Sequence, residues 1–237
     1  MVDVTDAVHV IKGTGPVLLT AEHASNRLPP RWDWQGQEHL ATQHWGIDLG
    51  IAPLTEALAT SLGAPAVLAR FTRLLVDPNR PVDSPTLFRD RADGHPVNMN
   101  ALVTPEGAAR RIAEYYEPYH AAIDAQLAQH KCKFLLSMHS FTPLYEGAPR
   151  SVEIGVLHPG NSAALAEQWR DALATTGRDV RVNEPYTGSN GYMYSAETHA
   201  DRFGIPCIEL EVRQDLLEDT SNHAEFVTLI TAALQTS

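Results

Sequence analysis

The chain has 237 residues, and its 18 Lys and Arg residues against 29 Asp and Glu residues give a formal net charge of −11. This acidic balance argues against nucleic acids and anionic membranes as partners. With 43% hydrophobic and 20% charged residues, the composition is that of a globular protein, and the length allows one sizeable core. We therefore expect one domain over residues 1–237.

Two features of the sequence predict a cytoplasmic protein. The two cysteines provide no disulfide framework, which suits a reducing compartment. The first residues carry acids where a signal peptide would carry positive charge, and no apolar run approaches the length of a membrane span. We expect neither secretion nor insertion into a membrane.

Apolar runs and helical spacings alternate along the chain, which is typical of α/β layers. In such folds polar groups collect at the carboxyl ends of the strands. In chain order, the pattern predicts a strand over 16–21, a helix over 46–62, strands over 66–69 and 74–76, a helix that begins at Thr104 and includes Leu127, strands over 134–138 and 152–157, a helix over 161–176, a strand over 205–212 and a helix over 222–235.

Two features of the predicted long helix and the segment before it need separate mention. Thr104 followed by Pro105 is a typical helix start, and the tyrosines among the helically spaced residues are expected in the core. The polar segment 79–100 has no clear period, and a loop of this length in a compact domain is more often functional than idle.

Polar side chains gather at the ends of three predicted strands. His23 follows the first strand, His139 follows another, and Glu209 and Glu211 share one face of a late strand by its period of two. Because strand ends converge on one crevice in an open sheet, these groups are expected to lie close together. Two histidines and a carboxylate form a catalytic zinc set, and a further carboxylate can act as general base.

The third metal ligand has two candidates at this point. Asp48 lies four residues after His44, so one helical turn would place both side chains on one face. It could bind the metal directly or orient a ligand histidine. Glu22 is the other candidate, but as the neighbour of His23 it should point the opposite way.

Other segments are suited to bind the substrate. Asn79 and Arg80 follow a predicted strand, where the guanidinium could hold a carboxylate or could instead pair with Asp77 or Asp83. The segment 183–194 is rich in Gly, Asn and Tyr, and is either an ordered loop that covers a site or a surface turn with packed tyrosines. The chain has no G-x-S-x-G motif for a serine hydrolase and no Gly-rich phosphate loop.

At these residues the sequence resembles the N-formylglutamate amidohydrolases and their predicted relatives. The matching segments run in family order across nearly the whole chain. They are EHASNRLP (22–29), HWGID (44–48), RLLVDPNRP (73–81), HSFTP (139–143), GVLH (155–158), NEPYTGSNGY (183–192) and IELEVRQDL (208–216).

The resemblance implies a fold and a ligand set. The family is similar to zinc carboxypeptidases and aspartoacylase-like deacylases, which implies a three-layer α/β/α fold of the phosphorylase/hydrolase-like type with a mainly parallel mixed sheet. His23 and His139 would bind the metal, Glu211 would activate water, and Asn79 with Arg80 would hold the α-carboxylate of the substrate. Carboxypeptidases have His-x-x-Glu where this chain has Asn26, which leaves Asp48 as the substitute for the third ligand.

The hypothesis is a metal-dependent amidohydrolase that cleaves the amide of an N-acyl amino acid, with N-formyl-L-glutamate as the first candidate and one divalent metal, zinc, as the cofactor. The alternatives are a deacylase or carboxypeptidase for another N-acyl amino acid or short peptide, and a non-catalytic module that binds a carboxylate. Further expected substrate contacts are Arg73, Ser140, Asn183, Tyr186, Tyr192 and Arg213.

Overall fold

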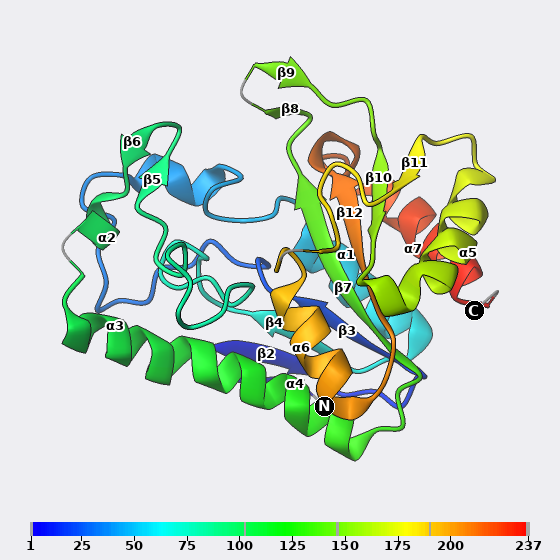
Figure 1. The fold of residues 1–237 in the computed structure, drawn as a ribbon, viewed down its shortest axis with the longest axis horizontal. Helices are drawn as coiled ribbons and strands as arrows, with labels where there is room; N and C mark the ends of the chain where they lie inside the picture. Colours follow the sequence, from blue (N-terminus) through cyan, green and yellow to red (C-terminus); the bar gives the residue numbers. More distant parts are fainter. Residues whose placement is uncertain (1, 102, 146, 190, 236–237) are drawn as a thin grey trace.

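The computed structural model describes residues 2–101, 103–145, 147–189 and 191–235. Within these residues eight strands form one mixed sheet (Figure 1). The strand order is β1 (Val2–Val4), β2 (Val8–Ile11), β4 (Ala66–Ala69), β3 (Val17–Ala21), β7 (Phe134–Phe141), β12 (Cys207–Arg213), β10 (Ile154–Leu157) and β11 (Val180–Val182). The four central strands β4, β3, β7 and β12 are parallel, whereas β2 and β10 run antiparallel to their inner neighbours.

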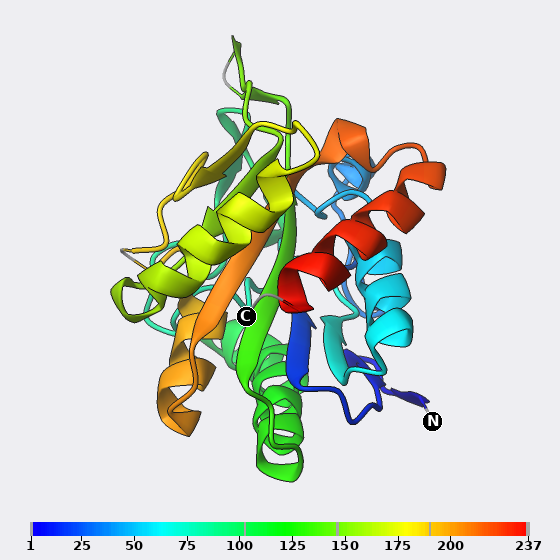
Figure 2. The ribbon, with the colours of Figure 1, turned by 90° about the vertical axis from the view of Figure 1, so that its right-hand side faces the viewer.

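Helices cover both faces of the sheet (Figure 2). One face packs against α1 (Ile51–Leu62), α5 (Ala163–Ala174) and α7 (Ser221–Gln235), and the other against α4 (Glu117–Gln129) and α6 (Tyr194–Phe203). The helix α3 (Pro105–Arg111) precedes α4. One π-helical turn, Ile112–Tyr116, joins α3 to α4 in a single rod. The expected class, helices on both faces of a mixed and mainly parallel sheet, is confirmed.

Shorter elements lie outside the sheet. They are the two-stranded ladders β5 (Arg91–Ala92) with β6 (His95–Pro96) and β8 (Leu144–Tyr145) with β9 (Ala148–Pro149), the helix α2 (Asn98–Ala101), and 3₁₀ turns at Glu38–Thr42, Gly160–Ser162 and Gln214–Leu216. None of the helices in the described ranges is both long and apolar enough to span a lipid bilayer.

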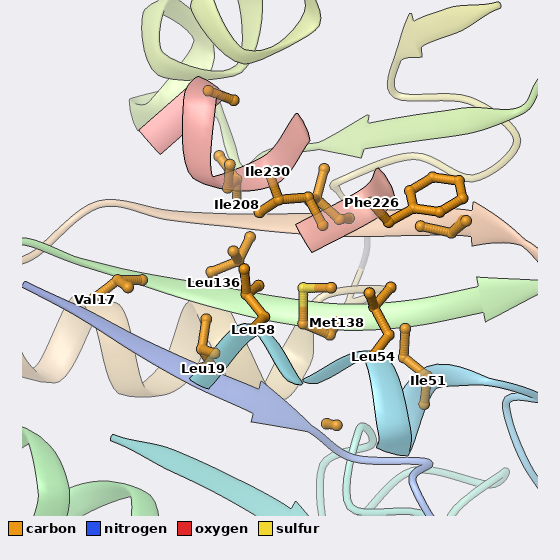
Figure 3. Close-up of a cluster of buried hydrophobic side chains, with 14 of the residues drawn as sticks. Val17, Leu19, Ile51, Leu54, Leu58, Leu136, Met138, Ile208, Phe226 and Ile230 are labelled. Carbon is orange, nitrogen blue, oxygen red and sulfur yellow. The ribbon is translucent and has the colours of Figure 1, made fainter. Parts of the chain in front are cut away.

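The alternation of side chains along β7 and β12 divides the core into two parts. On one face Leu136, Met138 and Ile208 pack against residues of α1 and α7, such as Leu58 and Ile230 (Figure 3). On the other face Leu135 and Cys207 pack against the tyrosines of the α3–α4 rod, which confirms their expected place in the core. The residues of β7 and β12 that alternate with Leu136, Met138 and Ile208 therefore lie on the same side of the sheet as the tyrosines.

The polar residues of β7 and β12 that matter for the site lie on this side. Glu209 lies opposite Ser137, and Glu211 lies opposite His139, in the parallel register of β12 and β7. On the other side of β12, Glu211 lies opposite Gly155. A Cβ at Gly155 would lie 2.1 Å from the Glu184 carbonyl oxygen. Because glycine has no Cβ, the segment that contains Glu184 can pass close to Gly155, beside Glu211.

The predicted start of one helix is confirmed, and the predicted start of another is corrected. Thr104 caps α3 as expected, with its Oγ1 accepting a hydrogen bond from the Gly107 N–H at 3.1 Å. The helix predicted over 46–62 begins only at Ile51, because Gly50 precedes it in a left-handed conformation with φ of 78°. His44 therefore lies in a turn and Asp48 in an irregular segment, and not on one helical face.

The strand predicted over 74–76 is wrong. Leu74, Leu75 and Val76 are fully buried, but their segment is a turn whose backbone bonds go elsewhere. The Leu74 carbonyl accepts from the Asn100 amide at 2.9 Å, and the Leu75 carbonyl accepts from the Arg111 guanidinium at 3.0 Å. A short apolar run indicates burial, and side chains here take the place of a neighbouring strand.

Candidate active site

A cavity of about 710 Å³ opens at the carboxyl ends of the central strands. Its lining includes His23 after β3, His139 near the end of β7, Glu209 and Glu211 of β12, and Asp48. The convergence that the sequence predicted for strand ends is thus what the fold produces. The rest of the wall comes from the segments after β4 and β7 and from the loop before α6.

His23, Asp48 and His139 offer one ligand atom each, all within 4.8 Å of one another. Asp48 Oδ2 lies 2.9 Å from His139 Nδ1 and 3.5 Å from His23 Nδ1. All three residues are buried, and among the described residues His23 Nδ1 has no hydrogen-bond partner. Two imidazole nitrogens and one carboxylate with room beside them fit the donor set of a catalytic zinc ion.

Glu22 points away from this group, as its position next to His23 led us to expect. Its Oε2 accepts a hydrogen bond from Ser137 Oγ at 2.8 Å and lies 3.1 Å from His139 Nε2. Glu22 therefore orients the far side of the His139 ring. Asn26 is not among the described residues that line the cavity, and Asp48 is the carboxylate that lies with both histidines.

Asp77 orients the other histidine, a role that the sequence analysis missed. Its Oδ1 accepts a hydrogen bond from His23 Nε2 at 2.8 Å, and its Oδ2 from Arg73 at 2.8 Å. Burial alone would raise the pKa of Asp77, but the charges of Arg73 and His23 hold it well below its usual value. A carboxylate on the far nitrogen of a histidine fixes the ring and makes it a better metal ligand.

Glu211 combines burial with an unsatisfied oxygen. The residue is 5% exposed, and its Oε2 has no hydrogen-bond partner among the described residues. Burial raises the pKa of Glu211 well above its usual value, although the charge of His139 acts against the rise. Burial likewise raises the pKa of the neighbouring Glu209 to about 7. Carboxylates with raised pKa values in a cavity are suited to proton transfer near neutral pH.

Asn79 and Arg80 lie together on the cavity wall. The Asn79 side chain donates to the Tyr192 carbonyl at 2.8 Å and accepts from the Ser195 N–H at 3.0 Å. The Arg80 guanidinium donates to the Asn79 carbonyl at 2.7 Å and lies 5.8 Å from the centre of the Tyr192 ring. Within the described residues Arg80 forms no ion pair, so the alternative of a pair with Asp77 or Asp83 is wrong.

The other predicted substrate contacts divide into two groups. Arg73, Ser140, Tyr186 and Tyr192 line the cavity together with Asn79 and Arg80. Two of these are already engaged, because Arg73 pairs with Asp77, and Ser140 Oγ donates to the Leu49 carbonyl at 2.8 Å.

Asn183 and Arg213 do not line the cavity, contrary to expectation. The Asn183 side chain accepts from the His158 and Gly188 backbone N–H groups at 3.2 and 2.9 Å, so it shapes the loop from within. Arg213 pairs with Asp215 and donates to the carbonyls of Arg150, Ser151 and Val152. Both side chains have backbone partners that leave them no part in the cavity wall.

Two arginines of the cavity wall were not predicted. Arg89 lies 5.1 Å from the centre of the Trp45 ring, and Arg150 lies 4.6 Å from that of Tyr145. Neither follows a predicted strand, so the sequence offers no signal for them. With Arg73 and Arg80 they place four guanidinium groups around one cavity, which favours an anionic ligand.

Comparison with known proteins gives a family match and similar structures. A family model described as N-formylglutamate amidohydrolase matches residues 15–218. The N-formylglutamate deformylase of Pseudomonas aeruginosa is 30% identical over 136 residues, which are 52% of this chain and 49% of that protein, so the match spans about half of this relative.

Two solved structures cover nearly the whole chain. A gene product of Agrobacterium tumefaciens superposes with a TM-score of 0.90 at 27% identity, over 98% of this chain and 95% of the other. The N-formylglutamate amidohydrolase of Ralstonia eutropha superposes with a TM-score of 0.76 at 20% identity, over 98% of this chain and 97% of the other, which shows a shared fold.

Proposed function

Since the chain belongs to the N-formylglutamate amidohydrolase family, whose members are hydrolases of carbon–nitrogen bonds outside peptides, we propose that it hydrolyses the amide of an N-acyl amino acid. The first candidate substrate is N-formyl-L-glutamate, which would give formate and L-glutamate. The observation that carries the proposal is the buried Glu211, whose Oε2 has no hydrogen-bond partner among the described residues, in the same cavity as the His23, Asp48 and His139 ligand atoms.

A divalent metal is part of this proposal, with zinc as the first candidate. His23, Asp48 and His139 would hold it, while Asp77 and Glu22 keep the two imidazole rings in place. When bound, such an ion polarises the scissile carbonyl and lowers the pKa of water in the site. The mixed nitrogen and oxygen donor set, and the unpartnered His23 Nδ1, support this assignment.

Residues of the chain transfer the proton and bind the substrate carboxylate. Glu211 accepts the proton of the attacking water at its free Oε2 and passes that proton to the nitrogen of the leaving amino acid. Arg80 binds the α-carboxylate through its guanidinium, and the neighbouring Asn79 holds the segment of Tyr192 beside it through the Tyr192 carbonyl and the Ser195 N–H. The buried walls keep bulk water away from these charged groups.

A second candidate, a deacylase for a larger acyl group, is favoured by the size of the cavity. About 710 Å³ lies within the range of about 300–1,000 Å³ found for pockets that take drug-sized ligands. N-formyl-L-glutamate is much smaller than such ligands. The cavity therefore has space for a longer acyl group on the same amino acid.

The test is hydrolysis of N-formyl-, N-acetyl- and longer N-acyl-L-glutamate by zinc-reconstituted protein, with a chelated sample as control. We expect metal-dependent release of L-glutamate with kcat of about 1 per second or more for the best acyl group. The acyl group with the highest kcat/KM identifies the natural class. Absence of turnover across the series, or turnover that survives chelation, would contradict the proposal.

A further inference from the structure

The turn 77–80 carries the Arg80 guanidinium, and bonds within the turn fix its shape. The Arg80 N–H donates to the Asp77 carbonyl at 3.2 Å, and the Asn79 N–H donates to Asp77 Oδ1 at 3.0 Å. The Arg80 guanidinium donates to the Asn79 carbonyl at 2.7 Å. Because this bond ties the side chain to its own turn, the position of the guanidinium follows the position of the turn.

Tyr116 binds the end of this turn to the α3–α4 rod. Its hydroxyl donates to the Arg80 carbonyl at 2.9 Å, and its buried ring lies 4.2 Å from that of His120, measured between the ring centres. Burial and the Tyr194 hydroxyl raise the pKa of Tyr116 well above its usual value, so its hydroxyl stays protonated and able to donate. Tyr116 is not among the described residues that line the cavity. It therefore acts on a ligand there through Arg80.

The rod has an irregular turn at Tyr116, for which Pro118 provides the physical reason. Proline has no N–H to donate, and inside a helix its ring collides with the carbonyl four residues earlier. The wider π-helical turn Ile112–Tyr116 lies directly before it, with the Glu117 N–H donating to the Ile112 carbonyl five residues earlier. Such turns are found frequently at functional sites. In this chain the turn ends at the tyrosine that holds the turn 77–80.

Arg80 depends on such backbone bonds because it has no acidic partner to hold it. Within the described residues Arg80 forms no ion pair, whereas Arg73 in the same cavity pairs with Asp77 at 2.8 Å. A group that is fixed before its ligand arrives loses less conformational freedom on binding. The bond from Tyr116 fixes Arg80 at its backbone and adds no carboxylate that would compete with a ligand.

We propose that Tyr116 is a positioning residue that holds Arg80 in place for the α-carboxylate of the substrate. This inference rests on the proposed function for the ligand of Arg80. Tyr116→Phe keeps the ring and removes the bond to the Arg80 carbonyl. Loss of one such hydrogen bond corresponds to a change in affinity of about 5–30-fold. The loss should affect binding of the carboxylate and leave proton transfer by Glu211 unchanged.

The kinetic test compares two substrates that differ in the α-carboxylate. They are the preferred N-acyl-L-glutamate and the same acyl derivative of 4-aminobutyrate, which is glutamate without that carboxylate. For the glutamate derivative we expect Tyr116→Phe to raise KM about 5–30-fold and to keep kcat within about twofold of the wild type. For the 4-aminobutyrate derivative kcat/KM stays within about twofold of the wild type. An equal loss for both substrates, or an unchanged KM for the first, overturns the role of Tyr116.

Two further variants separate positioning from a general effect on the fold. Tyr115→Phe removes the hydroxyl of the neighbouring tyrosine, whose ring packs 5.5 Å from that of Phe71, measured between the ring centres. Tyr115 forms no hydrogen bond through its side chain within the described residues, and its variant is expected to keep the KM of the wild type. In an Arg80→Met background, Tyr116→Phe should raise KM no further, because the two residues act as a unit. Additive effects of the two substitutions would contradict the proposal.

A binding measurement separates this inference from the proposed function. Calorimetry of the zinc-loaded protein is expected to show that the wild type binds L-glutamate more tightly than 4-aminobutyrate, and that Tyr116→Phe weakens the binding of glutamate alone. This result without any hydrolysis supports the role of Tyr116 and defeats the proposed function. Hydrolysis with the same glutamate affinity in both proteins overturns the role of Tyr116 and leaves the proposed function standing. A wild type that binds both ligands equally overturns the inference together with the role of Arg80.

Discussion

Two clusters among the described residues contain two histidines and one aspartate each, and one of them lines the large cavity. The cavity cluster is His23, Asp48 and His139, and the helix cluster, between α4 and α6, is His120, Asp124 and His199. In the helix cluster, His120 Nδ1 lies 2.8 Å from His199 Nε2, and His199 Nδ1 lies 2.6 Å from Asp124 Oδ1. Asp124 also pairs with Arg202.

The surroundings of the two clusters shift the pKa of a histidine in opposite directions. Burial, together with the charge of His199, lowers the pKa of His120 to about 4. Burial alone would also lower the pKa of His139, but the carboxylates of Glu209, Asp48 and Glu22 raise it well above its usual value. The comparison teaches that residue types alone do not define a metal site. The cavity and the surplus of carboxylates around its histidines distinguish the cavity cluster from the helix cluster.

The largest effect is expected for Glu211→Gln, which removes the proton acceptor and keeps the shape of the side chain. We expect kcat to fall by about 10²–10⁴-fold, because general base catalysis typically supplies that much. Metal content, measured by atomic emission, stays at the wild-type level. A kcat within a factor of three of the wild type would remove Glu211 from this role.

The next effect concerns the residues proposed to hold the metal. His23→Ala and His139→Ala are expected to lose the metal, and Asp77→Asn to weaken its binding about 10–100-fold, as found for carboxylates that orient ligand histidines. Zinc titration against a chelating dye measures these affinities. Asp124→Asn makes the same chemical change in the helix cluster and is expected to leave the zinc affinity unaltered. Equal affinities for the two Asn variants would refute the difference between the clusters.

The smallest effect is a pH dependence of stability from the helix cluster. Because the pKa of His120 is about 4 in the folded state and 6.5 in a model peptide, its unfolded form binds the proton more readily. Stability from a neutral His120 is thus present above pH 6.5 and lost as the pH falls toward 4. His120 is partly exposed, so we expect a loss of about 1–2 kcal/mol.

Urea unfolding of the wild type and His120→Gln at pH 7 and pH 4.5 checks this expectation. Groups of the cavity cluster titrate equally in both proteins, so the change in their difference reports on His120 and its contact with His199. The free energy of unfolding of the wild type should fall more on acidification than that of the variant. Parallel behaviour of the two proteins would show that His120 contributes nothing.

The sequence predicts those site residues whose positions follow from strand geometry. His23, His139 and Glu211 could be placed because each lies at or near the end of a strand, where a parallel sheet brings side chains together. Leu74 could not, because an apolar run does not reveal that Asn100 and Arg111 satisfy its backbone. Tertiary contacts, and not the local pattern, decide such segments.

Side-chain roles within matching motifs were harder to predict than their positions. Asn183 and Arg213 are polar residues in matching segments, but both bind backbone groups, and nothing in residue type distinguishes such a role from substrate contact. Asp77 was considered only as a partner of Arg80, although it binds His23 across 54 residues of sequence. Arg150 follows a short hairpin whose aromatic neighbours assemble only in the folded chain.

The same long separations have a kinetic consequence. His139 contacts Asp48 across 91 residues and Glu22 across 117. Contacts of such sequence separation form late, because the closure of long loops must precede them and slows folding. No short stretch of the chain can therefore assemble the cavity cluster in advance. A metal bound there links the first fifth of the chain to its middle, and so stabilises only the molecule that has completed its central sheet.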